Sequence, residues 1–352
     1  MNIKDLFSNA AKKGASDLHL VAGLPPALRI DGELLYIEGA NPISKKEMEV
    51  MVFSMIDDSQ KENFLSTREF DFGYAVDNSR FRVNIFFEKG NIGLVARVIN
   101  EKIPTIEDIE MPSIIYNLLD LKQGLILVTG PTGCGKSTSL AAMINYINAN
   151  RFCNIITFED PIEYVFAPDK SIIIQRQLGS DMISFNSALK HALRQDPNVI
   201  MVGEMRDLET IATTITLAET GHLVLATLHT YNSSQTIDRI IDIFPPHQQN
   251  QVRMQLSMTL AGVVSQRLLP KIGGGRVASR EILLNTPAVA NLIRENKIAQ
   301  IKTFIETSSK EGMMSIDQDL QRLFKEGQIT KEVAQSYMDN PEALDRPLKG
   351  RK

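Results

Sequence analysis

Cysteine is scarce in this sequence: Cys134 and Cys153 are the only two among 352 residues. Two cysteines cannot build a zinc ribbon or a disulfide framework, and they are typical of reduced thiols in a cytosolic protein. An excess of positive charge is also missing, because 38 lysines and arginines stand against 42 aspartates and glutamates, a net charge of −4. A surface that neutralises nucleic-acid phosphates is usually basic, so we expect no nucleic-acid partner.

Long apolar runs, internal repeats and low-complexity blocks are absent as well. Nowhere do about 18 apolar residues follow one another, so we expect no membrane-spanning helix, and only peripheral contact with any membrane machine. Residues 1–14 show the spacing of an amphipathic helix, interrupted by charged residues, and not the apolar region of a signal peptide. The apolar positions of that helix are Ile3, Leu6, Phe7, Ala10 and Ala11.

The length predicts two domains, and the first, residues 1–100, has the pattern of a mixed α/β domain with antiparallel strands. Residues 28–30 and 33–37 flank Asp31-Gly32, a pair that suits the positive φ angles of a type I′ hairpin turn. Further on, Arg80 and Arg82 share one face of a predicted strand, for which a solvated sheet face is the plainer interpretation.

A polar stretch at 101–105, with Pro104, is the expected linker. Short apolar strands then alternate with helices over 106–270, which predicts a parallel α/β sheet. Residues 271–352 are expected to hold a glycine-turn hairpin, helices and a mobile polar tail. The predicted strands are 125–129, 154–158, 171–174, 199–202 and 223–228, with a hairpin of 264–269 and 277–284, and the predicted helices include 137–150, 185–195, 208–219 and 233–244.

The segment 130–137, called the phosphate loop below, matches G-x-x-x-x-G-K-[ST] between an apolar strand and a helix-forming run. Its glycines let backbone N–H groups turn inward around phosphates at a helix N-terminus. Lys136 would reach the β- and γ-phosphates and the Ser137 hydroxyl would ligate Mg²⁺, so ATP and Mg²⁺ are the expected ligands. Cys134 is expected to be a small filler. The expected nucleotide-binding residues are Gly130, Pro131, Thr132, Gly133, Cys134, Gly135, Lys136, Ser137 and Thr138.

A carboxylate that handles the attacking water is expected after the strand 199–202, in a Walker B arrangement. Gly203 stands where an aspartate often holds the metal, and Glu204 follows it. Glu204 is therefore either the water-positioning base or a residue that reaches Mg²⁺ through water. A glutamate that merely begins a helix is the alternative.

A second acidic group follows the strand 154–158, at the strand end that faces the ligand crevice of an open parallel sheet. Three carboxylates crowd there, which suits a nearby cation because without one they would repel each other. Asp160 is the one that could reach Mg²⁺ through water, and a plain acidic loop is the alternative. The three are Glu159, Asp160 and Glu163.

Two histidines flank the strand 223–228. They fit badly as joint metal ligands, because seven residues along a strand place them up to ~23 Å apart, at about 3.3 Å per residue. His229 stands at the carboxyl end, where a γ-phosphate sensor could lie. His222 stands at the other end and is either structural or faces a neighbouring subunit.

Taken together, these motifs resemble the secretion ATPase superfamily, and within it the type IV pilus retraction ATPases, over essentially the whole chain. The phosphate loop and residues 156–164, 199–207 and 220–230 look like its Walker A, Asp, Walker B and His boxes. Residues 288–295 are similar to the A-I-R-N-L-I-R-E motif of the retraction family. Ala290 replaces the first arginine of that motif, so any role of this charge is in question.

The resemblance implies a small PAS-like α+β N-terminal domain on a RecA-like P-loop ATPase core with a helical C-terminal region, assembled as a homohexamer. It also implies docking on the platform protein at the cytoplasmic face of the inner-membrane pilus machine, beside a paralogous retraction ATPase. ATP hydrolysis would then drive pilus retraction and twitching motility. The expected catalytic residues are Glu204, Glu163, His229, Arg82 and Arg97.

The two arginines of that set are expected because nothing next to the phosphate loop in the sequence supplies one, and an arginine stabilises the charge on the transferred phosphoryl group. By the resemblance, Arg82 and Arg97 fall in the strands of the N-terminal domain that reach the nucleotide, with Arg80 close by.

Two other functions compete with the retraction motor. A pilus-assembly or type II secretion ATPase usually carries extra N-terminal sequence and a tetracysteine zinc site, and this sequence has neither. A non-hydrolysing, nucleotide-dependent binding module is the other. The complete phosphate loop with Glu163 and Glu204 argues against it.

Overall fold

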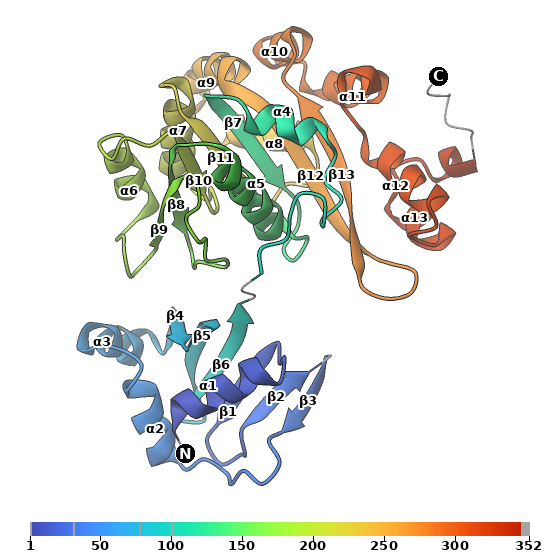
Figure 1. Ribbon diagram of the computed structural model, residues 1–352. Coiled ribbons are helices and arrows are strands. Elements are labelled where there is room, and N and C mark those ends of the chain that lie inside the picture. Colours follow the sequence, from blue (N-terminus) through green and yellow to red (C-terminus); the bar gives the residue numbers. More distant parts are fainter. Residues whose placement is uncertain (1, 31, 78, 100–101, 346–352) are drawn as a thin grey trace. The chain divides into compact units, whose positions relative to one another are not determined.

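The computed structural model describes residues 2–30, 32–77, 79–99 and 102–345. Its contacts divide the chain into two compact units, seen in Figure 1. The N-terminal unit comprises Met1–Lys102 and Pro161–Val165, and the core unit comprises Ile103–Asp160 and Phe166–Lys352. Asp31 of the predicted hairpin turn, residues 100–101 of the predicted linker and residues 346–352 of the predicted tail lie outside the described residues.

The N-terminal unit is a six-stranded antiparallel sheet in the order β3-β2-β1-β6-β5-β4. Three helices pack on one of its faces, where alternate strand residues such as Leu18, Leu94 and Val83 form the core. Arg82 and Arg97 are paired directly across β5 and β6 on the opposite face. The elements are α1 (Ile3–Lys12), β1 (Asp17–Val21), β2 (Ala27–Ile30), β3 (Glu33–Tyr36), α2 (Lys45–Phe53), α3 (Asp58–Thr67), β4 (Glu69–Val76), β5 (Ser79–Glu88) and β6 (Asn91–Ile99).

Helix α1 confirms the predicted amphipathic segment, because Ile3, Leu6, Phe7 and Ala10 are all buried. Helices α2 and α3 were not predicted, although each begins at a capping box. In α2 the Ser44 side chain and the Glu47 side chain satisfy each other's backbone N–H groups.

The core unit is built on a seven-stranded sheet in the order β13-β12-β7-β11-β10-β8-β9. All neighbouring strands are parallel except β12 and β13, which form the predicted hairpin. The predictions for 199–202 and 223–228 match β10 and β11, whereas β12 begins four residues earlier than predicted because its first residues pair with β7. The strands are β7 (Gly124–Thr129), β8 (Asn154–Glu159), β9 (Ile172–Gln177), β10 (Val199–Val202), β11 (Leu223–Leu228), β12 (Leu260–Pro270) and β13 (Arg276–Leu284).

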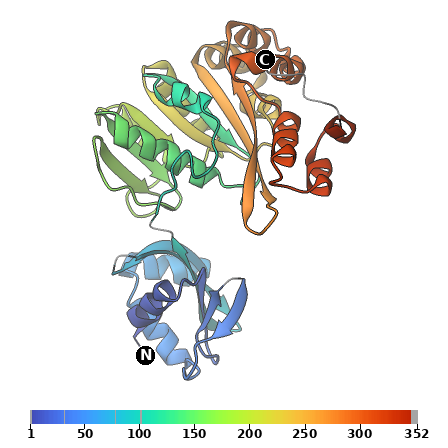
Figure 2. The same ribbon diagram turned by 45° about the vertical axis from the view of Figure 1, so that its right-hand side comes forward.

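Helices cover both faces of this sheet. The core of one face contains apolar residues of helices α6 to α11, and α5 lies across the other face in Figure 1. In both views the helices that follow β13 stand beside that edge of the sheet (Figure 2). The helices are α4 (Ile114–Leu119), α5 (Lys136–Asn150), α6 (Phe185–Ala192), α7 (Leu208–Glu219), α8 (Ser233–Asp242), α9 (Pro246–Thr259), α10 (Pro287–Arg294), α11 (Ile301–Thr307), α12 (Ile316–Lys325) and α13 (Lys331–Tyr337).

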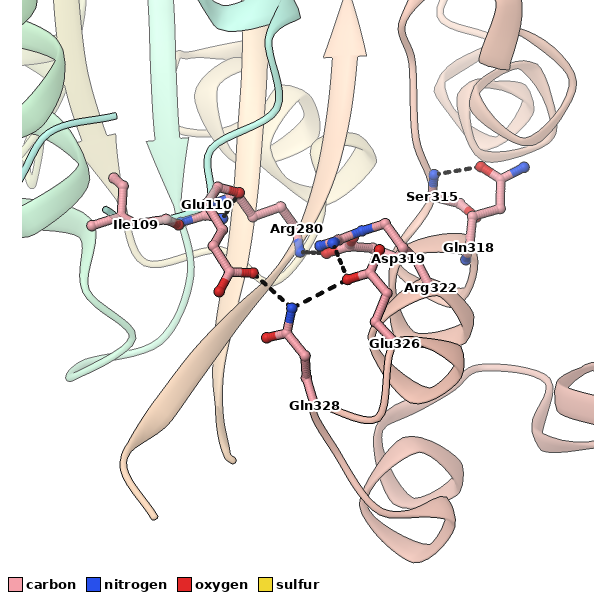
Figure 3. Close-up of polar contacts among 9 residues, drawn as sticks. All are labelled: Ile109, Glu110, Arg280, Ser315, Gln318, Asp319, Arg322, Glu326 and Gln328. Atoms are coloured by element: carbon pink, nitrogen blue, oxygen red, sulfur yellow. Dashed lines mark hydrogen bonds and ion pairs between the residues drawn. The ribbon is translucent and has the colours of Figure 1, made fainter. Parts of the chain in front are cut away.

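A buried arginine of β13 joins three parts of the core unit (Figure 3). Arg280 is 2% exposed, and its guanidinium donates to the carbonyl oxygens of Ile109 (2.8 Å) and Glu110 (3.0 Å). Its backbone N–H donates to the carboxylate of Asp319 on α12, which also accepts from Arg322. The segment that enters the core unit and the C-terminal helices are therefore held by the same strand residue.

Candidate nucleotide site

The phosphate loop connects β7 to α5, as the motif predicts. Gly130, Gly133 and Gly135 all have positive φ, and Gly135, at φ 88°, is the residue that caps α5. A Cβ on residue 130 would lie 2.3 Å from the carbonyl oxygen of Gln266, so a side chain has no room there. The loop therefore requires glycine at residue 135 because of its positive φ, and at residue 130 because a side chain would not fit.

The Lys136 side chain is folded back into this loop. Its exposed fraction is 9%, and its Nζ donates to the carbonyl oxygens of Gly130 (2.8 Å) and Pro131 (3.1 Å). The His229 Nδ1 atom lies 3.4 Å from the same Nζ. The ammonium group is thus held at the centre of the loop, where an anion bound at the start of α5 would meet it.

Glu204 and His229 meet at the carboxyl edge of the sheet, because β10 and β11 are neighbours in parallel register. One carboxylate oxygen of Glu204 lies 3.2 Å from His229 Nε2, and the other lies 2.8 Å from Arg206. Burial alone would raise the pKa of Glu204, but the hydrogen bond and charge of Arg206, with His229, hold that pKa below its ordinary value. Glu204 is therefore an ionised hydrogen-bond acceptor at neutral pH.

The other carboxylates at this edge differ in exposure. Glu159 is buried, and it accepts hydrogen bonds from Thr157 and Gln175. Asp160 is exposed. The hydrogen bond that Arg206 donates to Glu204 is the largest cause of the raised pKa of Arg206, and the charge of Asp160 adds to it. Asp160 thus belongs to the same charged group as Glu204 and Arg206.

Glu163, Arg82 and Arg97 belong to the N-terminal unit, so their place at the nucleotide stays a prediction. Within that unit Arg97 forms an ion pair with Asp17 at 2.9 Å, and Arg82 lies 3.9 Å from Asp71. Both arginine side chains are substantially exposed, at 72% and 45%.

No arginine adjoins the phosphate loop in the sequence, but the fold brings one beside it. Arg267 of β12 and residues Pro131–Cys134 line one cavity, whose other walls are Leu268 and two tyrosines, Tyr231 and Tyr337. A guanidinium and aromatic rings can stack on a planar ring, which suits this cavity to part of a nucleotide. β12 is adjacent to β7 in space but far from it in the sequence, so spacing alone could not reveal this neighbour.

Sequence reasoning also missed Arg206 and Gln266. Arg206 could have been found, because it follows Glu204 by two residues at the same strand end. Gln266 carried no local signal, yet its side chain forms hydrogen bonds with the phosphate loop and with α5.

The remaining predicted residues make ordinary structural contacts. Cys134 is buried, and burial raises the pKa of its thiol, which agrees with a filler role. His222 Nδ1 lies 3.0 Å from the carbonyl oxygen of Leu217 at the end of α7, a local structural contact. Ser137 and Thr138, in the first turn of α5, are half-buried. Gly203 lies close to the backbone of Phe158 and Glu159, so a longer side chain there would meet the end of β8.

Among the described residues, no helix is both long enough and apolar enough to cross a membrane.

Comparison with known proteins extends these findings. The chain is 46% identical over 343 residues to the type IV pilus retraction ATPase PilT of Pseudomonas aeruginosa, which covers 97% of this chain and 99% of that protein. It is 46% identical over 326 residues to a twitching motility protein of Neisseria gonorrhoeae, covering 92% of this chain and 87% of the relative. The crystal structure of the pilus retraction motor PilT with bound ADP matches with a TM-score of 0.92 and 45% identity, covering 99% of this chain and 100% of that one.

These matches confirm the predicted fold class, a small PAS-like α+β domain followed by a RecA-like P-loop core with a helical C-terminal region. The model of the type II/IV secretion system protein family matches residues 1–341, so the chain belongs to that family.

Proposed function

We propose that this chain is an ATP-hydrolysing motor that retracts type IV pili. The observation that carries the proposal is the match to a pilus retraction ATPase along nearly the full length of both chains. The relative named for twitching motility supports the same activity. The bound ADP of the similar crystal structure supports nucleotide binding at the phosphate loop.

ATP and Mg²⁺ fit the residues present. The three loop glycines have the positive φ angles that let backbone N–H groups turn toward a phosphate, and the Lys136 ammonium needs only to exchange two carbonyl oxygens for phosphate oxygens. Ser137 at the start of α5, with Glu204 or Asp160 acting through water, offers the oxygen ligands that Mg²⁺ prefers. The metal ion would neutralise charge on the phosphate oxygens.

His229 lies within hydrogen-bonding reach of the two halves of the proposed reaction. It is 3.4 Å from Lys136 on the phosphate side and 3.2 Å from Glu204 on the water side. Glu204, ionised and partly exposed, would hold the attacking water and accept its proton. As a sensor, His229 would couple the presence of the γ-phosphate to the position of Glu204.

The proposal also includes assembly as a homohexamer, two arginines that complete the site, and a position at the membrane where the motor acts. Arg82 and Arg97 of the N-terminal unit would complete the site, together with Glu163. The pair of Arg82 and Asp71 joins two exposed side chains, so exchanging Asp71 for a phosphate would cost little. Asp17, the partner of Arg97, is buried, so that exchange would cost more, although Arg29 stays 4.0 Å from Asp17. The motor would act at the cytoplasmic face of the inner membrane, on the platform protein and beside a paralogous retraction ATPase.

Two linked experiments test the function. A strain that lacks the gene is compared with its parent for surface pili and twitching, and is complemented with the wild-type chain or with Lys136→Ala. Retraction predicts hyperpiliated, non-twitching cells that only the wild-type chain rescues. Cells without pili would assign the chain to pilus assembly instead. In the second experiment the purified chain should release phosphate from ATP, and wild-type protein that binds ATP without releasing phosphate would be a binding module.

A further inference from the structure

Gln266 stands beside the first glycine of the phosphate loop. In the parallel pair of β12 and β7, Ser265 is opposite Thr129, so the next residues along, Gln266 and Gly130, are neighbours at the carboxyl edge. Gln266 is 1% exposed, and its carbonyl oxygen is the atom that a Cβ on residue 130 would meet at 2.3 Å. The backbone of Gln266 therefore limits one end of the loop to glycine.

The side chain of Gln266 reaches the other end of the loop. Its Nε2 donates to the carbonyl oxygen of Cys134 at 2.7 Å, and its Oε1 accepts from the Ser139 hydroxyl at 2.8 Å. Both polar atoms of the carboxamide therefore have a partner, because Nε2 has an acceptor and Oε1 has a donor. The orientation of the amide is thus set by its partners, and Ser139, in the second turn of α5, is a firm anchor.

The bond to Cys134 has a consequence for the neighbouring peptide group. In a planar trans peptide the N–H points away from the C=O of the preceding residue. Because the Cys134 carbonyl is turned toward Gln266, the N–H of Gly135 is turned to the opposite side, away from β12. That N–H belongs to the orphan donors at the start of α5, the groups that bind an anion at a helix N-terminus.

We infer that Gln266 is a positioning residue for nucleotide binding, which holds the phosphate loop open and its Gly135 N–H aimed at the phosphates. The inference rests on the proposed function, since it concerns the same nucleotide. Gln266 acts through the loop, without touching the nucleotide. Its removal lets the Cys134–Gly135 peptide turn, so part of the binding free energy is spent on ordering the loop.

The test compares Gln266→Met, which keeps the length and removes both hydrogen bonds, with Ser265→Ala. Ser265 is the matched control because its buried hydroxyl accepts from Thr129 on the opposite face of the same two strands. The readouts are the dissociation constant for a fluorescent ADP analogue, KM and kcat for ATP, and the melting temperature without nucleotide. Gln266→Met is expected to bind ADP about tenfold more weakly, the effect of leaving a buried acceptor unpaired.

KM for ATP should rise by a similar factor while kcat at saturating ATP stays within about threefold, because bound nucleotide reorders the loop. Ser265→Ala should lower the melting temperature but leave the dissociation constant unchanged. A Gln266→Met protein with the wild-type dissociation constant would overturn the inference, whatever its melting temperature. Wild-type protein that binds no ADP would instead overturn the proposed function.

Two further variants keep the test decisive if Gln266→Met fails to fold. Gln266→Glu retains the acceptor for Ser139 but has no donor for the Cys134 carbonyl, so it should weaken ADP binding at least as much. Ser139→Ala releases the other end of the carboxamide and should weaken binding by about fivefold. Where Gln266→Met does fold, adding Ser139→Ala to it should cause no further loss, because the two residues act as one unit. Additive losses, or wild-type affinity in Gln266→Glu, would contradict the inference.

Discussion

Replacing Arg280 with methionine tests how the segment that enters the core unit, at Ile109 and Glu110, is held on β13. Methionine keeps most of the aliphatic stem but removes the guanidinium that is drawn in Figure 3. The variant loses the two hydrogen bonds to the carbonyl oxygens of Ile109 and Glu110. It also leaves Asp319, which is 1% exposed, with one positive neighbour fewer.

The expected loss in the free energy of unfolding is the difference between two effects. Two hydrogen bonds from a charged donor contribute about 1.5–3 kcal/mol each, and they are lost. Against this, burial lowers the pKa of Arg280 to about 10, so the charged form is less favourable in the fold than in water. At about 1.4 kcal/mol for each pKa unit, that penalty is about 3–4 kcal/mol, and it disappears with the guanidinium. The net loss is then up to about 3 kcal/mol, at or below the lower end of the about 3–5 kcal/mol typical of a broken buried pair.

Calorimetry of the full chain is the suitable assay, because the sequence has no tryptophan for fluorescence. At about 2–4 °C for each kcal/mol, the melting temperature should fall by up to about 12 °C. Arg276→Met is the matched control, since Arg276 lies on the same face of β13 and is exposed. Equal shifts for Arg280→Met and Arg276→Met would refute the reasoning.

Three further predictions concern the reaction. Lys136→Ala should abolish ATP binding, whereas Glu204→Ala and Glu163→Ala should bind ATP normally and lose about 10²–10⁴ in turnover. If Glu204→Ala binds ATP as poorly as Lys136→Ala, Glu204 is not part of the site. If Glu163→Ala has near-normal turnover, Glu163 is not part of the site. Arg82→Ala and Arg97→Ala should bind nucleotide but hydrolyse slowly, and mixing either with Lys136→Ala protein should restore some activity if the arginine serves a neighbouring subunit; concentration-independent activity with no recovery would show complete single subunits. The pKa of Glu204 is held below its ordinary 4.5, so its stabilising contribution is present above that pH and is lost as the pH falls through the lowered pKa; the difference in melting temperature between wild type and Glu204→Gln should therefore shrink from pH 6 to pH 3.5, and a constant difference would contradict the ion pair with Arg206.

The parts of the fold that the sequence predicted well are the ones with short-range signals. β10 and β11 lie in the middle of a parallel sheet with helices on both faces, so their residues form nearly continuous apolar runs, with Thr227 the one polar residue. The phosphate loop is recognisable because its chemistry needs contiguous residues, and α1 because one face of it is apolar. α2 and α3 have weaker apolar periodicity, and only their capping boxes mark where they begin.

The site was predictable to the extent that topology brings strand ends together. Glu204 and His229 follow neighbouring parallel strands, and the structure places them 3.2 Å apart at the expected edge. Arg267 was missed because it enters from β12, which is next to β7 only in the folded sheet. The sequence shows only the neighbours of the loop along the chain, whereas Arg267 is a neighbour across the sheet.

Gln266 and Arg280 show why such contacts escape a reading of the sequence. They are opposite each other in the β12–β13 pair, yet Gln266 bonds to a residue 132 positions away and Arg280 to one 171 positions away. A polar residue in a strand usually predicts an exposed face, and here both are almost fully buried. Buried polar groups are kept where they satisfy backbone groups that have no regular partner. The phosphate loop and the turn before α4 both have such carbonyl groups, so the hairpin residues beside them must supply donors. That requirement becomes visible only when the β12–β13 hairpin is in its place in the sheet.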